Sequence, residues 1–521
     1  METGFRKWIV VATIIVAAII ELIDTTIVNV SINTMSGNLG ASLEDTAWVI
    51  TSYAIANVIV IPMTSFLAQK IGRKRYYIGS ILLFTVTSLF CGLSTHLWML
   101  VFWRFLQGVG GGALLSTSQS ILYDTFPPHQ RALASGIFSL GIIIGPSIGP
   151  VMGGYIVDNL SWQDIFYVNI PIGLAAAFLS NRFLRSSAAL KDGRTIDWLG
   201  IGLLTAGVGS LQVVLERGQT DDWFAANYII VLSVIAVVCI TMLVWWELRI
   251  PNPIIHFRVL KSRTLAISAI MTFVLGFGLF SNLFVFPLFS QRLIGYSAFQ
   301  TGMMLLPGTL IAASISPFLG KIMQSGIKPQ YLAIGGFLLS ATFGFLISGA
   351  NLSAGSDFFM IPLLLRGPGA SLLVVPLTAL AVSDLKPADI PQGAALNNMM
   401  RQMGGSFGIA LINTYVAHRA ASNRTALVAH ITSYDRPTQE RLQGLVRGFQ
   451  DQGLTYLEAS RKALGALEAT VVKQTFLMSY MNAFFLIAIL NACCIPLVVL
   501  TIRKRKRAVA AAAAPVVVSD H

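Results

Sequence analysis

Charged residues are scarce in this sequence of 521 residues, where Asp, Glu, Lys and Arg together make up 11%. A soluble chain of this length carries roughly a quarter charged residues. The deficit accompanies 55% hydrophobic residues and a mean hydropathy of +0.71, which predicts a chain whose solvent is mostly the lipid bilayer. The net charge of +13 does not indicate nucleic-acid binding, because the basic residues bracket apolar segments.

Cysteine is also rare, and its placement excludes two classes of protein. The four cysteines lie in apolar stretches without metal-ligand spacing, which excludes a disulfide framework and a zinc site: Cys91, Cys239, Cys493 and Cys494. The sequence has no nucleotide-binding loop and no nucleophile–base motif. We therefore expect no enzyme, no cofactor and no direct use of ATP. The first apolar segment is too long for a cleavable signal peptide and is predicted to be a transmembrane helix.

Apolar segments long enough to span a bilayer recur along the chain. We predict fourteen of them, at residues 8–32, 46–68, 76–95, 98–121, 134–156, 165–183, 197–216, 228–247, 265–289, 300–320, 331–350, 358–380, 393–416 and 476–500. An even number places both termini on one side of the membrane. The fold class is therefore an all-α integral membrane protein.

The distribution of Lys and Arg predicts which side the termini occupy. With the N-terminus inside, the inner segments hold 23 of these residues and the short outer loops hold two, Arg217 and Arg292. Cytoplasmic loops carry an excess of positive charge, so we expect cytoplasmic termini. The one long outer loop, 417–475, is predicted to contain one or two amphipathic helices. The tail after Arg507 has low complexity and is predicted to be disordered.

A weak internal repeat relates the two halves of the chain. A shift of 259 residues aligns five Gly or Pro residues of the first half with five of the second: Gly108 with Gly367, Gly110 with Gly369, Pro128 with Pro387, Gly145 with Gly404, and Gly149 with Gly408. Parallel repeats of this kind occur in transporters. We predict two pseudo-symmetric six-helix bundles, 1–185 and 261–502, separated by two inserted helices in 186–260 and followed by a basic tail, 503–521.

Two carboxylates lie near the middle of the first predicted span. Glu21 and Asp24 are three residues apart and share one helix face. In low dielectric they repel and lose solvation, which favours keeping a proton on at least one of them near neutral pH. Arg104, inside the fourth span, needs a partner in the bundle interior. A proton-coupling role is the functional interpretation, with Asp24 ahead of Glu21; the alternative is a satisfied pair bound to Arg104 or to hydroxyls.

The fifth span combines closely spaced glycines with two prolines. Glycines four residues apart line one helix face, and prolines inside a helix bend it. We expect a thin, kinked helix pressed against a neighbour, as a hinge or seal; generic small-residue packing is the alternative. The motif consists of Gly141, Gly145, Pro146, Gly149, Pro150, Gly153 and Gly154.

The loop after the second span is strongly basic. Its glycine permits a tight turn, and its basic cluster can bind acidic groups on neighbouring helices or simply anchor the inner face. The residues are Gln69, Lys70, Gly72, Arg73, Lys74 and Arg75. Glu216, Arg366 and Arg401 are weaker candidates for functional residues inside or at the end of spans.

These stretches together resemble the major facilitator superfamily, and within it the fourteen-helix drug:proton antiporter branch of EmrB/QacA-type exporters, closest to EmrB. The likeness covers almost the whole chain. It is carried by Leu22-Ile-Asp24-Thr-Thr-Ile-Val-Asn29, Trp48-Val-Ile-Thr-Ser-Tyr53, the 65–75 loop, Arg104-Phe-Leu-Gln-Gly108, Gly145-Pro146 through Gly154, Asn169-Ile-Pro171-Ile-Gly173 and Leu215-Glu216-Arg217-Gly218.

The resemblance implies proton-coupled efflux of hydrophobic or amphiphilic molecules from the inner membrane by alternating access. It implies that Asp24 is the carboxylate linked to proton or substrate, that Arg104 is its charge partner and that the fifth-span glycines form a seal. A periplasmic adaptor and an outer-membrane channel are the implied partners. The loop departs from the family pattern at Ser65 and Gln69, where Gly and Asp are usual, so either its basic residues need other partners or the gate is looser.

Two alternatives to multidrug efflux remain open. The chain could instead be a dedicated exporter of one physiological solute, such as a siderophore, a fatty acid or a lipid-like compound. A membrane receptor or scaffold without transport is the other, and the buried charges of Glu21, Asp24 and Arg104 argue against it, because intramembrane charge is costly.

Overall fold

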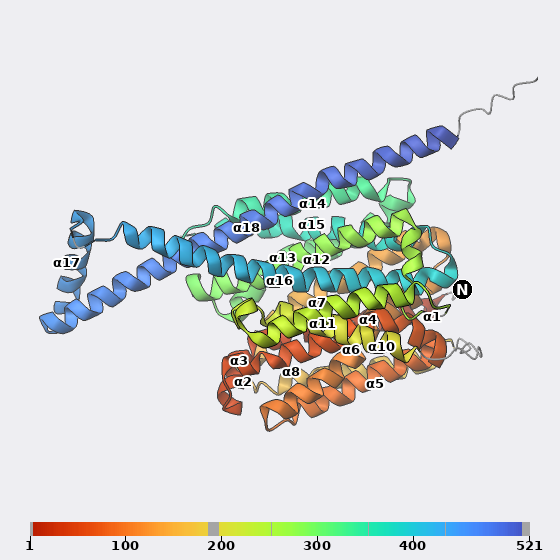
Figure 1. Cartoon of the computed structure of the whole chain (residues 1–521), viewed down its shortest axis with the longest axis horizontal. Coiled ribbons are helices and arrows are strands. Elements are labelled where there is room, and N and C mark those ends of the chain that lie inside the picture. Colours follow the sequence, from red (N-terminus) through yellow and green to blue (C-terminus); the bar gives the residue numbers. More distant parts are fainter. Residues whose placement is uncertain (1–3, 186–196, 252, 353, 433, 513–521) are drawn as a thin grey trace, which may run out of the picture.

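The fold is described from a computed structural model. It describes residues 4–185, 197–251, 253–352, 354–432 and 434–512, and these contain helices and no strand. The long helices run side by side in one bundle, with the N-terminus near one end and α17 beyond the other (Figure 1). The helices of the first half are α1 (Phe5–Ile27), α2 (Ile32–Leu39), α3 (Leu43–Thr46), α4 (Trp48–Ile71), α5 (Arg73–Gly92), α6 (Leu97–Thr125), α7 (Arg131–Asn159), α8 (Asp164–Tyr167) and α9 (Asn169–Phe183).

The second part of the chain begins with the two inserted helices. Its helices are α10 (Trp198–Arg217), α11 (Asn227–Glu247), α12 (Arg263–Phe289), α13 (Ala298–Gln324), α14 (Pro329–Ile347), α15 (Ser356–Ser383), α16 (Ile390–Ala429), α17 (Arg436–Gln450) and α18 (Tyr456–Ala512). A short 3₁₀ turn, η3 (Trp223–Ala225), follows α10. The prediction of an all-α membrane protein is confirmed.

Thirteen helices in the described ranges are long and apolar enough to cross a membrane. The fourteenth predicted span, 393–416, lies in α16, which packs against α12, α18 and α4 inside the bundle. Its composition is too polar for the same criterion, since it contains Asn397, Asn398 and Arg401. These three side chains are buried in the protein and do not face lipid. A span can carry such residues when its neighbours satisfy them. Fourteen spans therefore fit the structure.

Two helices extend well beyond their predicted spans. α16 continues to Ala429, and α18 begins at Tyr456, so that together with α17 they form an arm that projects from the end opposite the N-terminus (Figure 1). A small core of Val446, Ala459 and Ala463 holds α17 against α18. The amphipathic helices expected in 417–475 are thus present.

The C-terminal tail differs from its prediction. Disorder was expected directly after Arg507, but α18 continues to Ala512. The alanine run that follows the basic residues has high helix propensity and prolongs the helix for several residues. Residues 513–521 lie outside the described part of the chain.

The glycines that define the sequence repeat make corresponding contacts in the two halves. A Cβ atom on Gly145 would lie 2.6 Å from Leu22 of α1, and one on Gly404 would lie 2.0 Å from the Phe273 carbonyl of α12. Each glycine therefore lets its helix approach the first helix of its own half. Gly108 makes the same kind of close contact with α4, and Gly367 with α13.

The inserted helices occupy different environments. α10 packs against α11, against α4 of the first half and against α16 of the second. α11 exposes most of its apolar side chains and buries few, as expected for a helix at the lipid boundary. α10 is therefore placed to contact both halves at once.

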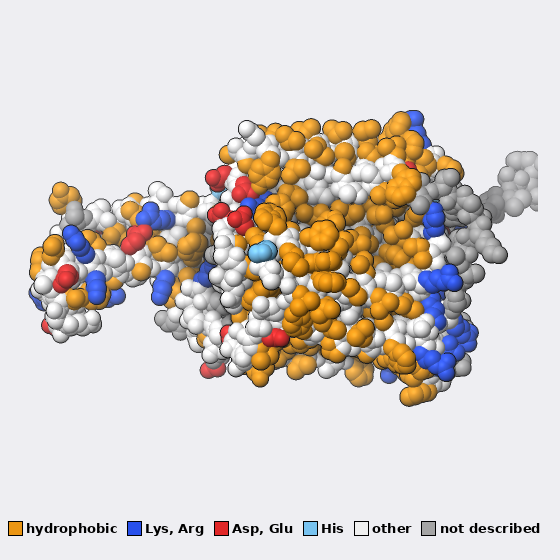
Figure 2. All heavy atoms as spheres, turned by 90° about the horizontal axis from the view of Figure 1, so that it is seen from below, with side chains coloured by type: hydrophobic (Ala, Val, Ile, Leu, Met, Phe, Trp, Pro, Cys, Tyr) orange, Lys and Arg blue, Asp and Glu red, His pale blue; other side chains and the backbone are white. Residues whose placement is uncertain are grey.

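The two halves also meet directly along α7 and α13. A Cβ atom on Gly320 of α13 would lie 2.7 Å from the Ala132 carbonyl near the start of α7, and one on Gly302 would lie 2.5 Å from Val151 near its end. The interface is thus closed near both ends. The surface shows an apolar belt with a band of Lys and Arg at one end, hereafter the basic end (Figure 2). The N-terminus lies at this end.

Candidate functional site

Asp24 sits in a buried polar network near the end of α1 that is remote from the basic end. Its side chain is 0% exposed. Arg104 Nη1 of α6 donates to Asp24 Oδ2 at 2.6 Å. Gln107 Nε2 and Asn169 Nδ2 donate to Asp24 Oδ1 at 3.1 and 2.8 Å. Both carboxylate oxygens are therefore occupied by donors, one of them cationic.

Arg104 is fixed by the same network. Its Nη1 also donates to Gln107 Oε1 at 2.8 Å, and its Nε donates to the Val49 carbonyl at 3.2 Å. The guanidinium lies 4.3 Å from the centre of the Tyr53 ring, a cation–π distance. Ser88 Oγ closes the network by accepting from Gln107 Nε2 and from Asn169. The predicted partnership of Arg104 with a carboxylate of the first span is present in the structure.

Glu21 lies one turn deeper in α1 and has a different environment. Asn57 Nδ2 of α4 donates to Glu21 Oε1 at 2.9 Å, and Oε2 has no hydrogen-bond partner among the described residues. The Tyr53 hydroxyl, also without a partner there, is close by, since a Cβ atom on Gly111 would touch both it and the Glu21 side chain. Glu21 is 3% exposed. It is a buried carboxyl with one unoccupied oxygen, beside a free hydroxyl.

The remaining charged candidates lie on other helices. Arg401 of α16 is buried and interacts electrostatically with Glu21 across the interface between the halves, without a direct ion pair. Arg366 of α15 lines a small cavity between the halves. Glu216, near the end of α10, accepts from Gln212 Nε2 at 2.9 Å. The structure thus brings Glu21 and Arg401 near each other, whereas Glu216 lies apart with its own hydrogen-bond donor.

The glycine face of α7 packs against the helix that carries the carboxylates. A Cβ atom on Gly149 would lie 2.0 Å from Thr26 Oγ1, and one on Gly153 would lie 2.5 Å from Val30. Gly141 faces α1 at ordinary contact distance. Pro146 points the other way, into the cavity that Arg366 lines. The motif therefore holds α1 tightly on one face and borders the second half on the other.

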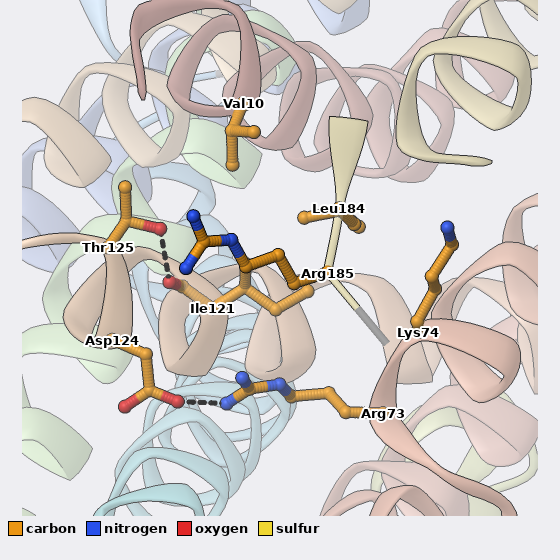
Figure 3. Close-up of a pocket in the computed structure, with 8 residues that line it drawn as sticks. All are labelled: Val10, Arg73, Lys74, Ile121, Asp124, Thr125, Leu184 and Arg185. Carbon is orange, nitrogen blue, oxygen red and sulfur yellow. Dashed lines mark hydrogen bonds and ion pairs between the residues drawn. The ribbon is translucent and has the colours of Figure 1, made fainter. Parts of the chain in front are cut away.

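The basic loop connects α4 to α5 at the basic end. Gly72 has a φ of 94°, which glycine adopts without strain. Arg73 forms an ion pair with Asp124 of α6, and Lys74 Nζ donates to the Asn181 carbonyl of α9 at 2.6 Å. Both residues line the pocket in Figure 3, where Arg73 points toward Asp124. Lys70 and Arg75 are exposed, and Gln69 donates to the hydroxyl of Ser65 in its own helix.

A larger cavity lies close to this loop. It has a volume of about 300 Å³ and is lined mainly by hydroxyl groups and other polar side chains of α4 and α6, with Arg73 of α5 and Pro391 of α16. The hydroxyls of Thr117 and Ser120 in its wall have no hydrogen-bond partner among the described residues. The cavity is a water-accessible recess between the halves, large enough for part of a small molecule.

At the opposite end, the segment after α10 bridges the halves. Arg217 Nη1 donates to the Glu44 carbonyl of the first half at 2.7 Å. Trp223 Nε1 donates to Thr414 Oγ1 of α16 at 3.0 Å. Asp222 and Trp223 have φ values of 53° and 51°, in the left-handed region that costs energy for residues other than glycine. The strained turn directs Trp223 toward the second half and ties the two halves together.

Sequence reasoning missed the neutral members of the Asp24 network. Gln107 and Asn169 stand inside the motif stretches named above, but an amide carries no charge that would single it out. Ser88 and Asn57 have no sequence signal beyond being polar in an apolar helix. Asp124, the partner of Arg73, lies at the end of α6 and could only be assigned once the packing of α5 against α6 was known.

The arrangement defines a multi-pass membrane transporter, with two helical halves that enclose ionisable side chains. The chain belongs to the Major Facilitator Superfamily, whose family model matches residues 14–409. It is 33% identical over 487 residues to the multidrug export protein EmrB of Escherichia coli K12, covering 93% of both chains. It is 32% identical to the fatty acid resistance protein FarB of Neisseria gonorrhoeae, covering 92% of this chain and 93% of FarB. The resemblance to EmrB-type exporters is confirmed.

Two solved structures share the fold. The human organic anion transporter MFSD10 superposes with a TM-score of 0.58 at 12% identity and covers 93% of this chain and 99% of its own. A bacterial homologue of the lysosomal transporter Spinster, in an inward-facing and unoccupied conformation, has a TM-score of 0.56 at 14% identity, with coverages of 96% and 99%. At these identities the comparison concerns the fold alone.

Proposed function

We propose that this transporter exports hydrophobic or amphiphilic small molecules in exchange for protons, by alternating access. Its relatives include a multidrug export protein and a colistin resistance protein that is 28% identical to this chain, and these support efflux. The inward proton gradient is the proposed energy source, and no cofactor is needed.

The observation that carries the proposal is the unoccupied oxygen of Glu21. A buried carboxylate is stable only if it is paired, hydrogen-bonded or protonated. Glu21 accepts a hydrogen bond from one amide through one oxygen, and its other oxygen has no partner among the described residues. Binding of a proton would neutralise this buried carboxylate. Asp24 is already neutralised by Arg104 and bonded through both oxygens. The contacts therefore favour Glu21 as the proton carrier and Asp24 with Arg104 as the fixed charge pair beside it.

Arg401 links the protonation of Glu21 to the conformational change. When Glu21 is ionised, its charge attracts Arg401 across the interface and favours approach of the two halves. When Glu21 is protonated, this attraction is lost and the interface separates more easily. A ligand shifts such an equilibrium only by its differential affinity for the two arrangements, and the proton has that difference here.

The basic end is proposed to face the cytoplasm, because positive charge collects there and cytoplasmic loops carry the excess of Lys and Arg (Figure 2). The hydroxyl-lined cavity near that end would then receive substrate from the inner side. With the inner membrane as its location, the arm of α16, α17 and α18 projects into the periplasm. There it is the proposed contact for an adaptor and an outer-membrane channel.

Export of a single physiological solute is the second candidate. It is favoured by the similarity to FarB, whose name records fatty acid resistance. A broad screen separates the two candidates, because loss of resistance to one compound only, on deletion of the gene, would support the dedicated exporter.

The test is substrate-driven proton movement in proteoliposomes with an imposed pH gradient. Glu21→Gln keeps the size of the side chain and the bond from Asn57 but cannot carry a proton. We expect it to abolish gradient-driven efflux of a fluorescent hydrophobic dye while substrate binding persists. Asp158→Asn, at the exposed end of α7, is the matched control and should transport like the parent. Efflux by Glu21→Gln at the parental rate would refute the assignment, and efflux that survives an uncoupler would refute proton coupling.

A further inference from the structure

Arg366 lies in the middle of the bundle beside an apolar cavity. It is ten residues into α15. The cavity, about 20 Å³, lies between the halves and is lined by α7, α12, α13 and α15. Its wall includes Leu279 and Leu283 of α12, and its polar groups other than Arg366 are the hydroxyls of Ser147 and Thr309. Arg366 is the one charged residue in the lining.

The interior charges of the described spans leave Arg366 without a carboxylate. Arg104 is paired with Asp24, and Arg401 faces Glu21. Across the described residues, Arg366 makes no hydrogen bond or ion pair. The Arg366 side chain is partly buried, and a guanidinium stays protonated in proteins, so it cannot reduce its desolvation cost by losing its charge.

The acidic residues of the second half lie too far from Arg366 to form an ion pair with it. Between residues 261 and 434 the sequence contains only three, Asp357, Asp384 and Asp389. All three lie at helix ends. Along α15, Asp357 is about 13 Å and Asp384 about 27 Å from Arg366, at 1.5 Å per residue. The other acidic residues of this half lie in the arm: Asp435, Glu440, Asp451, Glu458 and Glu468. Among the described residues, the interior of this half therefore holds cations and no anion.

The repeat shows what this half lacks. The same shift of 259 residues that relates the glycines aligns Gln107 with Arg366 and Asp24 with Leu283. In the first half, Gln107 donates to Asp24 at 3.1 Å. In the second half, the corresponding residues line one cavity, but the amide is replaced by a cation and the carboxylate by an apolar side chain. The described residues therefore offer Arg366 no negative partner.

We propose that Arg366 binds the anionic headgroup of an amphiphilic substrate, a carboxylate or sulfonate, whose apolar body lies against Leu279, Leu283 and the neighbouring face of α7. The proposal rests on the proposed export function and specifies its substrate class. A guanidinium fits such a headgroup with two parallel hydrogen bonds. The cavity holds only about one water molecule in the present closed arrangement. Because its walls belong to both halves, separation of the halves widens it.

The test measures equilibrium binding to the purified full-length protein in detergent, without any gradient. The probes are a dansyl alkylsulfonate, which is always charged, and the dansyl alcohol of the same chain length. We expect Arg366→Gln to weaken sulfonate binding at least about tenfold, since hydrogen bonds to charged groups are worth this much. Binding of the alcohol should change less than about twofold. Arg263→Gln, which removes an exposed cation at the end of α12, controls for net charge.

Leu283→Asp tests the same idea by supplying the missing carboxylate. Its side chain pairs with Arg366 from the position that Asp24 occupies in the first half, so we expect sulfonate binding to fall and alcohol binding to persist. Arg366→Lys should keep the preference for the anion with lower affinity. Equal loss of both probes in Arg366→Gln, or parental sulfonate affinity in Leu283→Asp, would overturn the proposal. Because binding needs no gradient, a failure of proton-driven efflux leaves this outcome unaffected and is read separately.

Discussion

Replacing Asp24 by Asn turns one oxygen of a fully bonded, buried carboxylate into an amide nitrogen. One oxygen accepts from Arg104, and the other accepts from Gln107 and Asn169. Wherever the new nitrogen points, it faces a donor, and Arg104 keeps its charge without a counter-ion. Removing one partner of a buried ion pair costs about 3–5 kcal/mol. We expect Asp24→Asn to lower the free energy of unfolding by about this amount, in addition to any effect on transport.

The assay is denaturant-induced unfolding of the protein in detergent micelles, followed by tryptophan fluorescence and by loss of helical circular dichroism. Arg104→Gln completes a double-mutant cycle, because it leaves Asp24 without its cation. The double variant removes both charges, and we expect it to recover about 2 kcal/mol relative to the sum of the single changes. Glu21→Gln is the comparison. It affects one hydrogen bond, and we expect the free energy of unfolding to change by about 1 kcal/mol or less.

Two results would refute this reasoning. If Asp24→Asn unfolds at the parental denaturant concentration, the pair is not buried and bonded in the working protein. If the double variant loses as much stability as the two single variants together, the two side chains do not interact. In either case the assignment of Asp24 as a fixed partner of Arg104 fails, and Asp24 becomes the stronger candidate for the proton.

Two further predictions concern packing and closure. Gly149→Ala places a methyl group against Thr26 and should destabilise the protein by about 1–3 kcal/mol, whereas Gly202→Ala, which meets open space, should be neutral or stabilising in the same unfolding assay. Trp223→Phe removes the bond to Thr414 across the halves and should raise accessibility of cysteines introduced near that end to a water-soluble maleimide. Unchanged labelling would show that the bridge does not hold the halves closed.

The sequence predicts the helices well because lipid imposes a simple rule on composition, and α16 shows where that rule weakens. Its buried asparagines and Arg401 face protein, so its hydropathy is low although its place in the bundle is central. Hydropathy reports the average around a helix, and it cannot show which face meets lipid. The repeat and the loop charges do not depend on hydropathy, and they support this span independently of its composition.

The ionisable residues of the site could be predicted from the sequence, whereas the separate roles of Glu21 and Asp24 could not. Glu21 and Asp24 look alike in sequence, three residues apart on one helix. They differ because α6 and α9 bring Arg104 and Asn169 to Asp24, while Glu21 accepts a hydrogen bond from the amide of Asn57. Such a difference depends on tertiary packing between helices far apart in the chain. A sequence pattern identifies the groups that need partners and leaves the partners open.

The arm formed by α16, α17 and α18 has a mechanical consequence, because two of its helices are continuous with the transport core. Residues 456–475 of α18 extend about 30 Å beyond the predicted span at 1.5 Å per residue. A rigid lever of that length moves at its tip by about half an ångström for each degree through which the second half turns. A probe attached at Tyr434, which is 93% exposed, would convert small rotations inside the membrane into measurable displacements outside it. The position of the arm therefore reports the rotation of the second half during the transport cycle.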